Sequence, residues 1–161
     1  MEQLEYVRRD ARCAVATFEN LLLLHFSESL RLADFQAFAV AHKKVLAKHP
    51  GGVGVIALVE STGLVPSAEV REAARRLTDE TASDVLFHAT VLFGEGFWAS
   101  ALRALVNGIF LLSRSRYPQS VFSSMEDAVH WSALRWPAPH GWPAHIIEVV
   151  GRFREEATHA R

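Results

Sequence analysis

Cysteine is nearly absent from this chain of 161 residues. Cys13 is the single example, and one thiol excludes an internal disulfide and any metal site built from several thiolates. Cys13 alternates with apolar residues in a short segment of strand character, which favours a buried, inert thiol over a nucleophile. A chain so poor in cysteine suits a reducing compartment, and we therefore expect it in the cytoplasm.

An excess of one charge is also lacking. Seventeen Lys and Arg residues stand against 18 Asp and Glu residues, which gives a formal net charge of −1. Because the two signs are interspersed, no overall field attracts a polyanion. We expect no nucleic acid among the partners of this protein.

Long apolar runs are missing as well. The most apolar segment, residues 104–112, contains Asn107 and is less than half of the ~20 residues that span a bilayer. The first ten residues carry charges of both signs and no apolar stretch of signal-peptide length. The sequence therefore predicts neither a membrane span nor export.

The common catalytic and cofactor motifs do not occur. The chain has no G-x-S-x-G, no P-loop and no G-x-G-x-x-G, so hydrolysis and nucleotide binding lack support. His42 and His49 are seven residues apart, without the i, i+4 spacing and the helper carboxylate of a zinc-enzyme helix. We expect no metal, no cofactor and no catalytic residue.

Apolar residues are plentiful, and their spacing predicts a single globular α/β domain. Half of the residues are hydrophobic, enough for a chain of this length to bury a core without a disulfide or metal. The spacing predicts strands at 4–9, 13–19, 21–26, 53–60, 85–93 and around 120–122. It predicts helices at 32–49, 67–82, 97–114 and 125–134, and a last helix with Ile146, Val149, Val150 and Phe153 on its apolar face.

This order of elements predicts a small mixed sheet of about five to six strands with helices packed on it. The first strands are joined by tight turns and are expected to be antiparallel. The later strands alternate with helices, and the nearly continuous apolar runs at 53–60 and 85–93 are typical of parallel strands buried on both faces. We expect a domain at 1–136, then a proline-containing linker at 137–143 and the amphipathic helix that ends the 137–161 segment.

Residues 120–134 carry a pattern that resembles a known family. A strand with a Val-Phe pair leads through a polar turn into a helix with two acidic residues, an alanine and a tryptophan. The residues concerned are Val121, Phe122, Glu126, Asp127, Ala128 and Trp131. The pattern resembles STAS domains, in particular the bacterial SpoIIAA-like (STAS/SEC14-like) branch, and the likeness extends over residues 21–134.

The resemblance implies a non-enzymatic regulatory or protein-interaction module similar to the anti-sigma-factor antagonists. Its partner would be a protein, and the chain could also form a homodimer. Members of that family are switched by phosphorylating a serine in a D-S-S-G-like turn after the central strand. The turn at 60–67 lacks this motif but offers Ser61, Thr62 and Ser67. The SEC14-like branch implies a different role, the carriage or sensing of a lipid or another small apolar ligand.

A site in such a fold is expected where loops follow the carboxyl ends of parallel strands. The residues that meet this condition are Glu60, Ser61, Thr62, Ser67, Gly94, Glu95, Gly96 and Ser123. They could line a cleft for a ligand or a partner, or they could be helix caps and turn formers only. An enzyme that uses Glu60 or Glu95 as a base is a third hypothesis, which requires a carboxyl group of raised pKa in a pocket.

The predicted helix at 97–114 is apolar nearly all round. Candidate interface residues on it are Phe97, Trp98, Leu105, Ile109 and Phe110. Some neighbour must cover this surplus of apolar surface. The domain's own core, a second copy of the chain and an apolar ligand held in a cavity are the three alternatives.

Overall fold

A computed structural model describes residues 3–60, 66–112, 116–136 and 142–160; the side chains of residues 98, 105 and 107–112 lie outside that description. Six strands form one sheet in this part of the chain: β1 (Glu5–Arg9), β2 (Cys13–Phe18), β3 (Leu21–Phe26), β4 (Val53–Val59), β5 (Val85–Leu92) and β6 (Gln119–Phe122). The helices are α1 (Leu32–Lys48), α2 (Ala68–Thr81), α3 (Phe97–Leu112), α4 (Met125–Ala133) and α5 (Trp142–Thr158).

The strands lie in the sheet in their order along the chain. β1, β2 and β3 pair antiparallel, whereas β3, β4, β5 and β6 pair parallel, each joined to the next through a helix. The predicted mixed sheet with an antiparallel start and a parallel remainder is therefore confirmed. The expected elements also occur, with ends that differ by a few residues.

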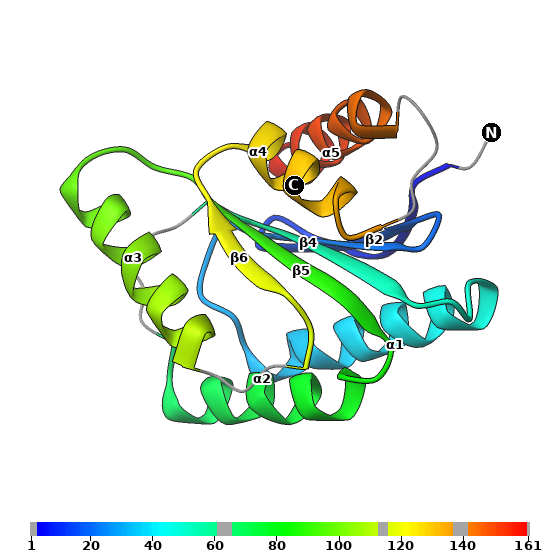
Figure 1. Cartoon of the computed structure of the whole chain (residues 1–161), viewed down its shortest axis with the longest axis horizontal. Coiled ribbons are helices and arrows are strands. Elements are labelled where there is room, and N and C mark those ends of the chain that lie inside the picture. Colours follow the sequence, from blue (N-terminus) through cyan, green and yellow to red (C-terminus); the bar gives the residue numbers. More distant parts are fainter. Residues whose placement is uncertain (1–2, 61–65, 113–115, 137–141, 161) are drawn as a thin grey trace.

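Helices cover both faces of the sheet. Figure 1 shows α1 and α2 below it, α4 and α5 above it, and α3 beside β6 at one side. Alternate residues of β3, β4 and β5 point to opposite faces because the side-chain period of a strand is two. The face towards α4 and α5 carries Leu21, Leu23, Ile56, Leu58, Phe87 and Val91, and the face towards α1 carries Leu22, Leu24, Phe26, Val55, Ala57 and Val85.

Two serines begin helices as their types predict. The Ser67 hydroxyl accepts a hydrogen bond from the Val70 N–H at 3.2 Å, and Ser124 accepts one from the Asp127 N–H at 3.2 Å. Each bond satisfies a donor that the first turn of a helix leaves unpaired. Ser67, one of the predicted switch residues, is therefore the N-cap of α2.

The linker predicted at 137–143 is wrong at its end. α5 begins at Trp142, and Trp142 is buried in the same core as the sheet. Pro143 is accepted in the first turn because a helix provides no partner for an N–H there. The expected boundary at 136 adjoins residues 137–141, which the structure does not describe.

A buried carboxylate fixes the start of α1. Asp34 is fully buried and accepts hydrogen bonds from Arg8 at 2.6 Å, from both terminal nitrogens of Arg12 at 3.1 Å, and from the Arg31 N–H at 2.7 Å. Burial alone would raise the pKa of this carboxyl group. The hydrogen bonds from Arg12 and Arg31 and the charges of Arg12 and Arg8 outweigh burial, and the pKa of Asp34 lies below its ordinary value.

We expect Asp34→Asn to lower the free energy of unfolding at pH 7 by about 2–4 kcal/mol, because Arg8 and Arg12 lose a buried partner. Since the folded-state pKa is depressed, this stabilisation is present above the unfolded pKa of ~3.9 and is lost as the pH falls through the folded value. Urea unfolding between pH 7 and pH 2 measures both effects. Asp79→Asn, in an exposed pair with Arg75, is the control and should change stability by about 0.5 kcal/mol or less; an equal loss in both variants would contradict the role of Asp34.

Candidate functional site

The described residues among those predicted to line a cleft lie at the end of the sheet where the parallel strands finish. Glu60 follows β4, Gly94, Glu95 and Gly96 follow β5, and Ser123 follows β6, where the parallel strands end. Gly94 and Gly96 have φ angles of 130° and 91°, which residues with side chains rarely adopt. Glu95 and Ser123 are exposed, while the predicted Ser61 and Thr62 lie outside the described residues.

Glu60 is held in a cluster that connects the sheet to α5. Arg154 donates two hydrogen bonds to its carboxylate, at 2.6 Å and 2.9 Å, and its guanidinium lies 3.5 Å from the centre of the Phe93 ring. Nε2 of the buried His25 lies 3.2 Å from the same carboxylate. A carboxylate can only accept, so this nitrogen carries a proton and donates it.

The two carboxylates proposed as a catalytic base do not fit that role. Burial would raise the pKa of Glu60, but the hydrogen bonds and charges of Arg154 and His25 outweigh it and hold the pKa below its ordinary value. A catalytic base that works near neutral pH needs a raised pKa. Glu95, the other candidate, is exposed to solvent. The Glu60 cluster instead fixes α5 against the carboxyl end of β4.

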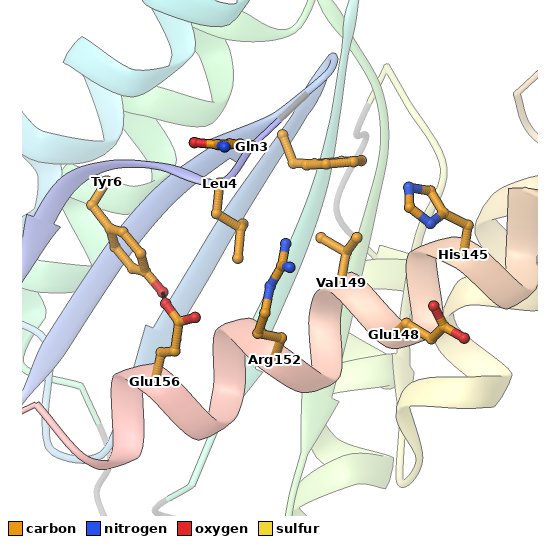
Figure 2. A pocket seen from close by; sticks show the side chains of 9 residues that line it. Gln3, Leu4, Tyr6, His145, Glu148, Val149, Arg152 and Glu156 are labelled. Atoms are coloured by element: carbon orange, nitrogen blue, oxygen red, sulfur yellow. Dashed lines mark hydrogen bonds between the residues drawn. The ribbon is translucent and has the colours of Figure 1, made fainter. Parts of the chain in front are cut away.

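A groove of about 500 Å³ runs between α5 and the first two strands (Figure 2). The side chains that line it are Gln3, Leu4, Tyr6, Phe18, His145, Glu148, Val149, Arg152 and Glu156. Tyr6 donates a hydrogen bond to Glu156 at 2.7 Å, and burial together with this carboxylate raises the pKa of Tyr6. Because Arg152 stands against Glu148 and Glu156, the groove has no single charge with which to select a ligand.

A second hollow, of about 370 Å³, lies between the sheet and helices α1, α2 and α3. We call it the α2 cavity. Its described lining is Leu22, Leu24, Phe26, Leu30, Phe35, Phe38, His42, Val55, Ala57, Pro66, Ala74, Leu77, Thr78, Thr81, Val85, His88, Thr90, Val106, Tyr117 and Gln119. It extends from Leu30 and Pro66, which follow the carboxyl ends of β3 and β4, to Thr81 and Val85 at the other end of the sheet.

The α2 cavity exists because α2 packs along α1 instead of directly on the sheet. Val70 is buried, but Ala73, Ala74 and Leu77, on the same apolar side of α2, remain only half-buried. The face of the sheet opposite α2 carries short side chains such as Ala57 and Thr90. Protein interiors leave few voids larger than a water molecule, whereas small-molecule sites measure about 300–1,000 Å³. The α2 cavity therefore has the size of a ligand site.

The lining of the α2 cavity is uncharged. It contains no Asp, Glu, Lys or Arg among the described residues, and its titratable groups include His42 and His88. Burial lowers the pKa of His88 to about 4. Burial also lowers the pKa of His42, against the weaker opposing effect of Asp84, to below its ordinary value. Both imidazoles are neutral near pH 7, and the cavity suits a molecule that is itself mostly apolar.

The predicted interface helix is described in part. Phe97 is 79% exposed, and Val106 lines the α2 cavity. The side chains of Trp98, Leu105, Ile109 and Phe110 lie outside the described residues, so the homodimer surface stays a prediction. The alternative of an apolar ligand required a cavity beside this helix, and the α2 cavity meets that requirement.

Sequence reasoning did not identify the walls that α1 and α2 contribute. His42 belongs to the helical spacing that predicts the helix at 32–49, and this spacing does not distinguish a packed face from a cavity wall. One signal was present: His88 and Thr90 interrupt an otherwise apolar strand, and their side chains point to the same face. Polar residues inside an otherwise apolar strand indicate that the face of the sheet that carries them is not covered completely by apolar core residues.

In the described ranges, no group of three or more His, Cys, Asp or Glu residues is placed to hold a metal ion. None of the helices in that part of the chain has the length and apolarity to cross a membrane. No family model, curated protein or solved structure matches this chain. The resemblance to STAS domains stays a prediction from the residues quoted for it.

Proposed function

We propose that this protein binds a small apolar molecule in the α2 cavity and acts as its carrier or sensor, in the cytoplasm and without catalysing a reaction. The observation that carries the proposal is the volume of about 370 Å³, lined mainly by apolar side chains and, among the described residues, by no Asp, Glu, Lys or Arg. Binding needs no catalytic group. This agrees with Glu60, which is paired with Arg154, and with Glu95, which is exposed to solvent.

The half-buried stripe of α2 supports the proposal energetically. A ligand in the cavity would cover Ala74 and Leu77 from one side and Val55 and Ala57 from the other. Covering apolar surface contributes about 25 cal/mol for each Å² removed from water. Binding would therefore bury both the ligand and a face of α2 that the protein alone leaves partly open.

The lack of charged side chains in the described lining indicates which molecules fit the cavity. An ion moved into an uncharged, apolar space loses its hydration without gaining a partner of opposite charge. A molecule with a mainly hydrocarbon body and few polar groups avoids this cost. We therefore expect neutral, lipid-like or aromatic compounds to bind.

Filling the cavity with a larger side chain tests the proposal. We expect wild-type protein to bind the neutral fluorescent compound N-phenyl-1-naphthylamine, and Ala57→Leu to weaken this binding roughly tenfold or more, since extra methylenes forced into an occupied space cost about 1–3 kcal/mol. Ala74→Leu places the larger side chain on α2, opposite Ala57, and should have the same effect. Fluorescence titration measures the affinities.

Ala144→Leu is the matched control, because it adds the same atoms to an exposed position of α5 and should leave the affinity unchanged. Thermal unfolding of each variant checks that it is folded. The proposal is contradicted if the wild type does not bind the compound, or if folded Ala57→Leu and Ala74→Leu proteins both bind it with wild-type affinity.

A second candidate function is the regulatory module that the STAS resemblance implies, with a protein partner and a possible homodimer. One observation favours it: Ser67 is exposed and begins α2, the helix that covers the cavity. A phosphate on Ser67 would add about −1.5 to −2 charges at a helix N-terminus, where negative charge is stabilising. Phosphorylation would thus change the surface next to Pro66, which lines the cavity.

Mass spectrometry of the protein isolated from the cells that produce it tests this second function. The expected result is a phosphate on Ser67, Ser61 or Thr62 in a fraction of the molecules that changes with growth conditions. Absence of phosphate from the peptide that contains residues 60–67, under several conditions and with full coverage of that peptide, would contradict it.

A further inference from the structure

The face of the sheet that lines the α2 cavity presents its side chains in rows. Neighbouring strands are in register, so residues paired across β3, β4, β5 and β6 stand side by side on this face. Two such rows consist of residues that line the cavity. The first row is Leu22, Val55, His88 and Gln119, and the second is Leu24, Ala57 and Thr90.

Each row changes from apolar to polar between β4 and β5. In these rows β3 and β4 contribute hydrocarbon side chains, whereas β5 and β6 contribute an imidazole, a hydroxyl group and an amide, from His88, Thr90 and Gln119. We call these three residues the polar floor. Paired residues of adjacent strands are about 5 Å apart, and alternate residues of one strand about 7 Å. The polar floor is therefore one continuous patch.

Polar side chains continue from this patch onto the neighbouring wall. Tyr117, two residues before Gln119, lines the cavity and is hydrogen-bonded to Thr78 of α2, which lines it too. Val85 at the start of β5 and Val106 of α3 are apolar parts of the same lining. One side of the cavity is thus amphipathic, while the side formed by β3 and β4 is apolar.

The residues of the polar floor are within reach of a molecule in the cavity. All three line it, and the side chains of His88 and Gln119 are only half-buried. His88 and Gln119 each have an interaction within the protein as well. An imidazole has two ring nitrogens, and a side-chain amide has one oxygen and two N–H groups, so each residue can hold a further partner.

The polar floor offers hydrogen bonds without charge. Because burial lowers the pKa of His88 to about 4, its imidazole is neutral near pH 7 and has one donor and one acceptor. The hydroxyl of Thr90 and the amide of Gln119 also donate and accept. A hydrocarbon placed against such groups displaces water without replacing its hydrogen bonds, and this costs affinity. A neutral hydrogen-bonding group on the ligand avoids the cost.

We propose that the α2 cavity binds an uncharged amphipathic molecule, with its hydrocarbon body over β3 and β4 and a hydrogen-bonding group, a hydroxyl or a carbonyl, over the polar floor. The inference rests on the proposed function, because it names the class and the orientation of the molecule that the cavity binds. It makes His88, Thr90 and Gln119 the residues that determine specificity, and it excludes a pure hydrocarbon as the preferred ligand.

The test compares three naphthalenes as competitors of N-phenyl-1-naphthylamine: 2-naphthol, 2-methylnaphthalene and 2-naphthoate. The first two have nearly the same shape, but only 2-naphthol forms hydrogen bonds. A cavity that merely removed apolar surface from water would favour 2-methylnaphthalene, the more hydrophobic of the two. We expect 2-naphthol to bind at least as tightly as 2-methylnaphthalene, and the charged 2-naphthoate to bind more weakly than 2-naphthol.

Variants connect the preference to the polar floor. Gln119→Met keeps the length of the side chain and removes the amide, and His88→Leu removes the imidazole. Each should lower the ratio of 2-naphthol to 2-methylnaphthalene affinity about three- to tenfold, the contribution of one hydrogen bond. The affinity for 2-methylnaphthalene should stay the same or rise, which a merely damaged cavity would not show.

Thr90→Val, which keeps the shape of the side chain, provides a second measurement if His88→Leu does not fold. Gln36→Met is the matched control, because it makes the same substitution at an exposed position of α1 and should keep the wild-type ratio.

The outcomes separate this inference from the proposed function. Tighter binding of 2-methylnaphthalene or 2-naphthoate than of 2-naphthol by the wild type, or an unchanged ratio in every folded variant of the polar floor, would overturn the inference while leaving the cavity a ligand site. If neither the fluorescent compound nor any of the three competitors binds, the proposed function itself is overturned.

Discussion

The alternation of apolar side chains along β3, β4 and β5 determines where every other part of the molecule lies. Because successive residues point to opposite faces and both sets are apolar, the sheet has to be covered on both sides. On one side α4 and α5 supply large buried residues such as Trp142 and Phe153. On the other side α1 supplies Phe38 and Val45 over the first strands, but the space beneath α2 stays unfilled. The two faces thus differ in how completely they are packed.

Charged contacts fix α1 and α5 to the sheet, and none of those between described residues does so for α2. Asp34, with Arg8 and Arg12, fixes the start of α1 to the β1–β2 hairpin. Glu60 and Arg154 fix α5 to the end of β4. Among the described residues, α2 is held mainly by its packing along α1 and by its own cap at Ser67. A helix held in this way can approach the sheet or a ligand without breaking a buried ion pair.

Local patterns allowed most of the fold to be predicted from the sequence. The apolar run at Val53–Val59, the helical spacing of α1 and the caps at Ser67 and Ser124 depend on neighbours in the chain, and each is where its pattern indicates. The start of α5 at Trp142 could not be predicted as well. Three prolines and a glycine in residues 137–143 are typical of a linker, yet burial of Trp142 in the core favours a helix from that residue.

The candidate site depends on contacts between distant segments, which single-sequence patterns do not report. Glu60 meets a partner 94 residues away, and this meeting turned a predicted cleft residue into an anchor for α5. His42 lines the α2 cavity together with residues of β3, β4 and β5 that lie far from it in the chain. The volume under α2 depends on the spacing of helix and sheet, and the polar residues His88 and Thr90 inside a buried strand are its one sign in the sequence.

Hydrogen exchange of the backbone amides of α2 tests the central claim most directly, that this helix covers an unfilled ligand cavity. In the free protein, we expect the amides of residues 68–81 to exchange faster than those of residues 142–158, because few of the side chains of α2 are buried. Saturation with N-phenyl-1-naphthylamine should slow exchange in α2 about tenfold or more relative to α5. Exchange rates in α2 that equal those of α5 in the free protein, and that do not change when N-phenyl-1-naphthylamine is added, would contradict the account.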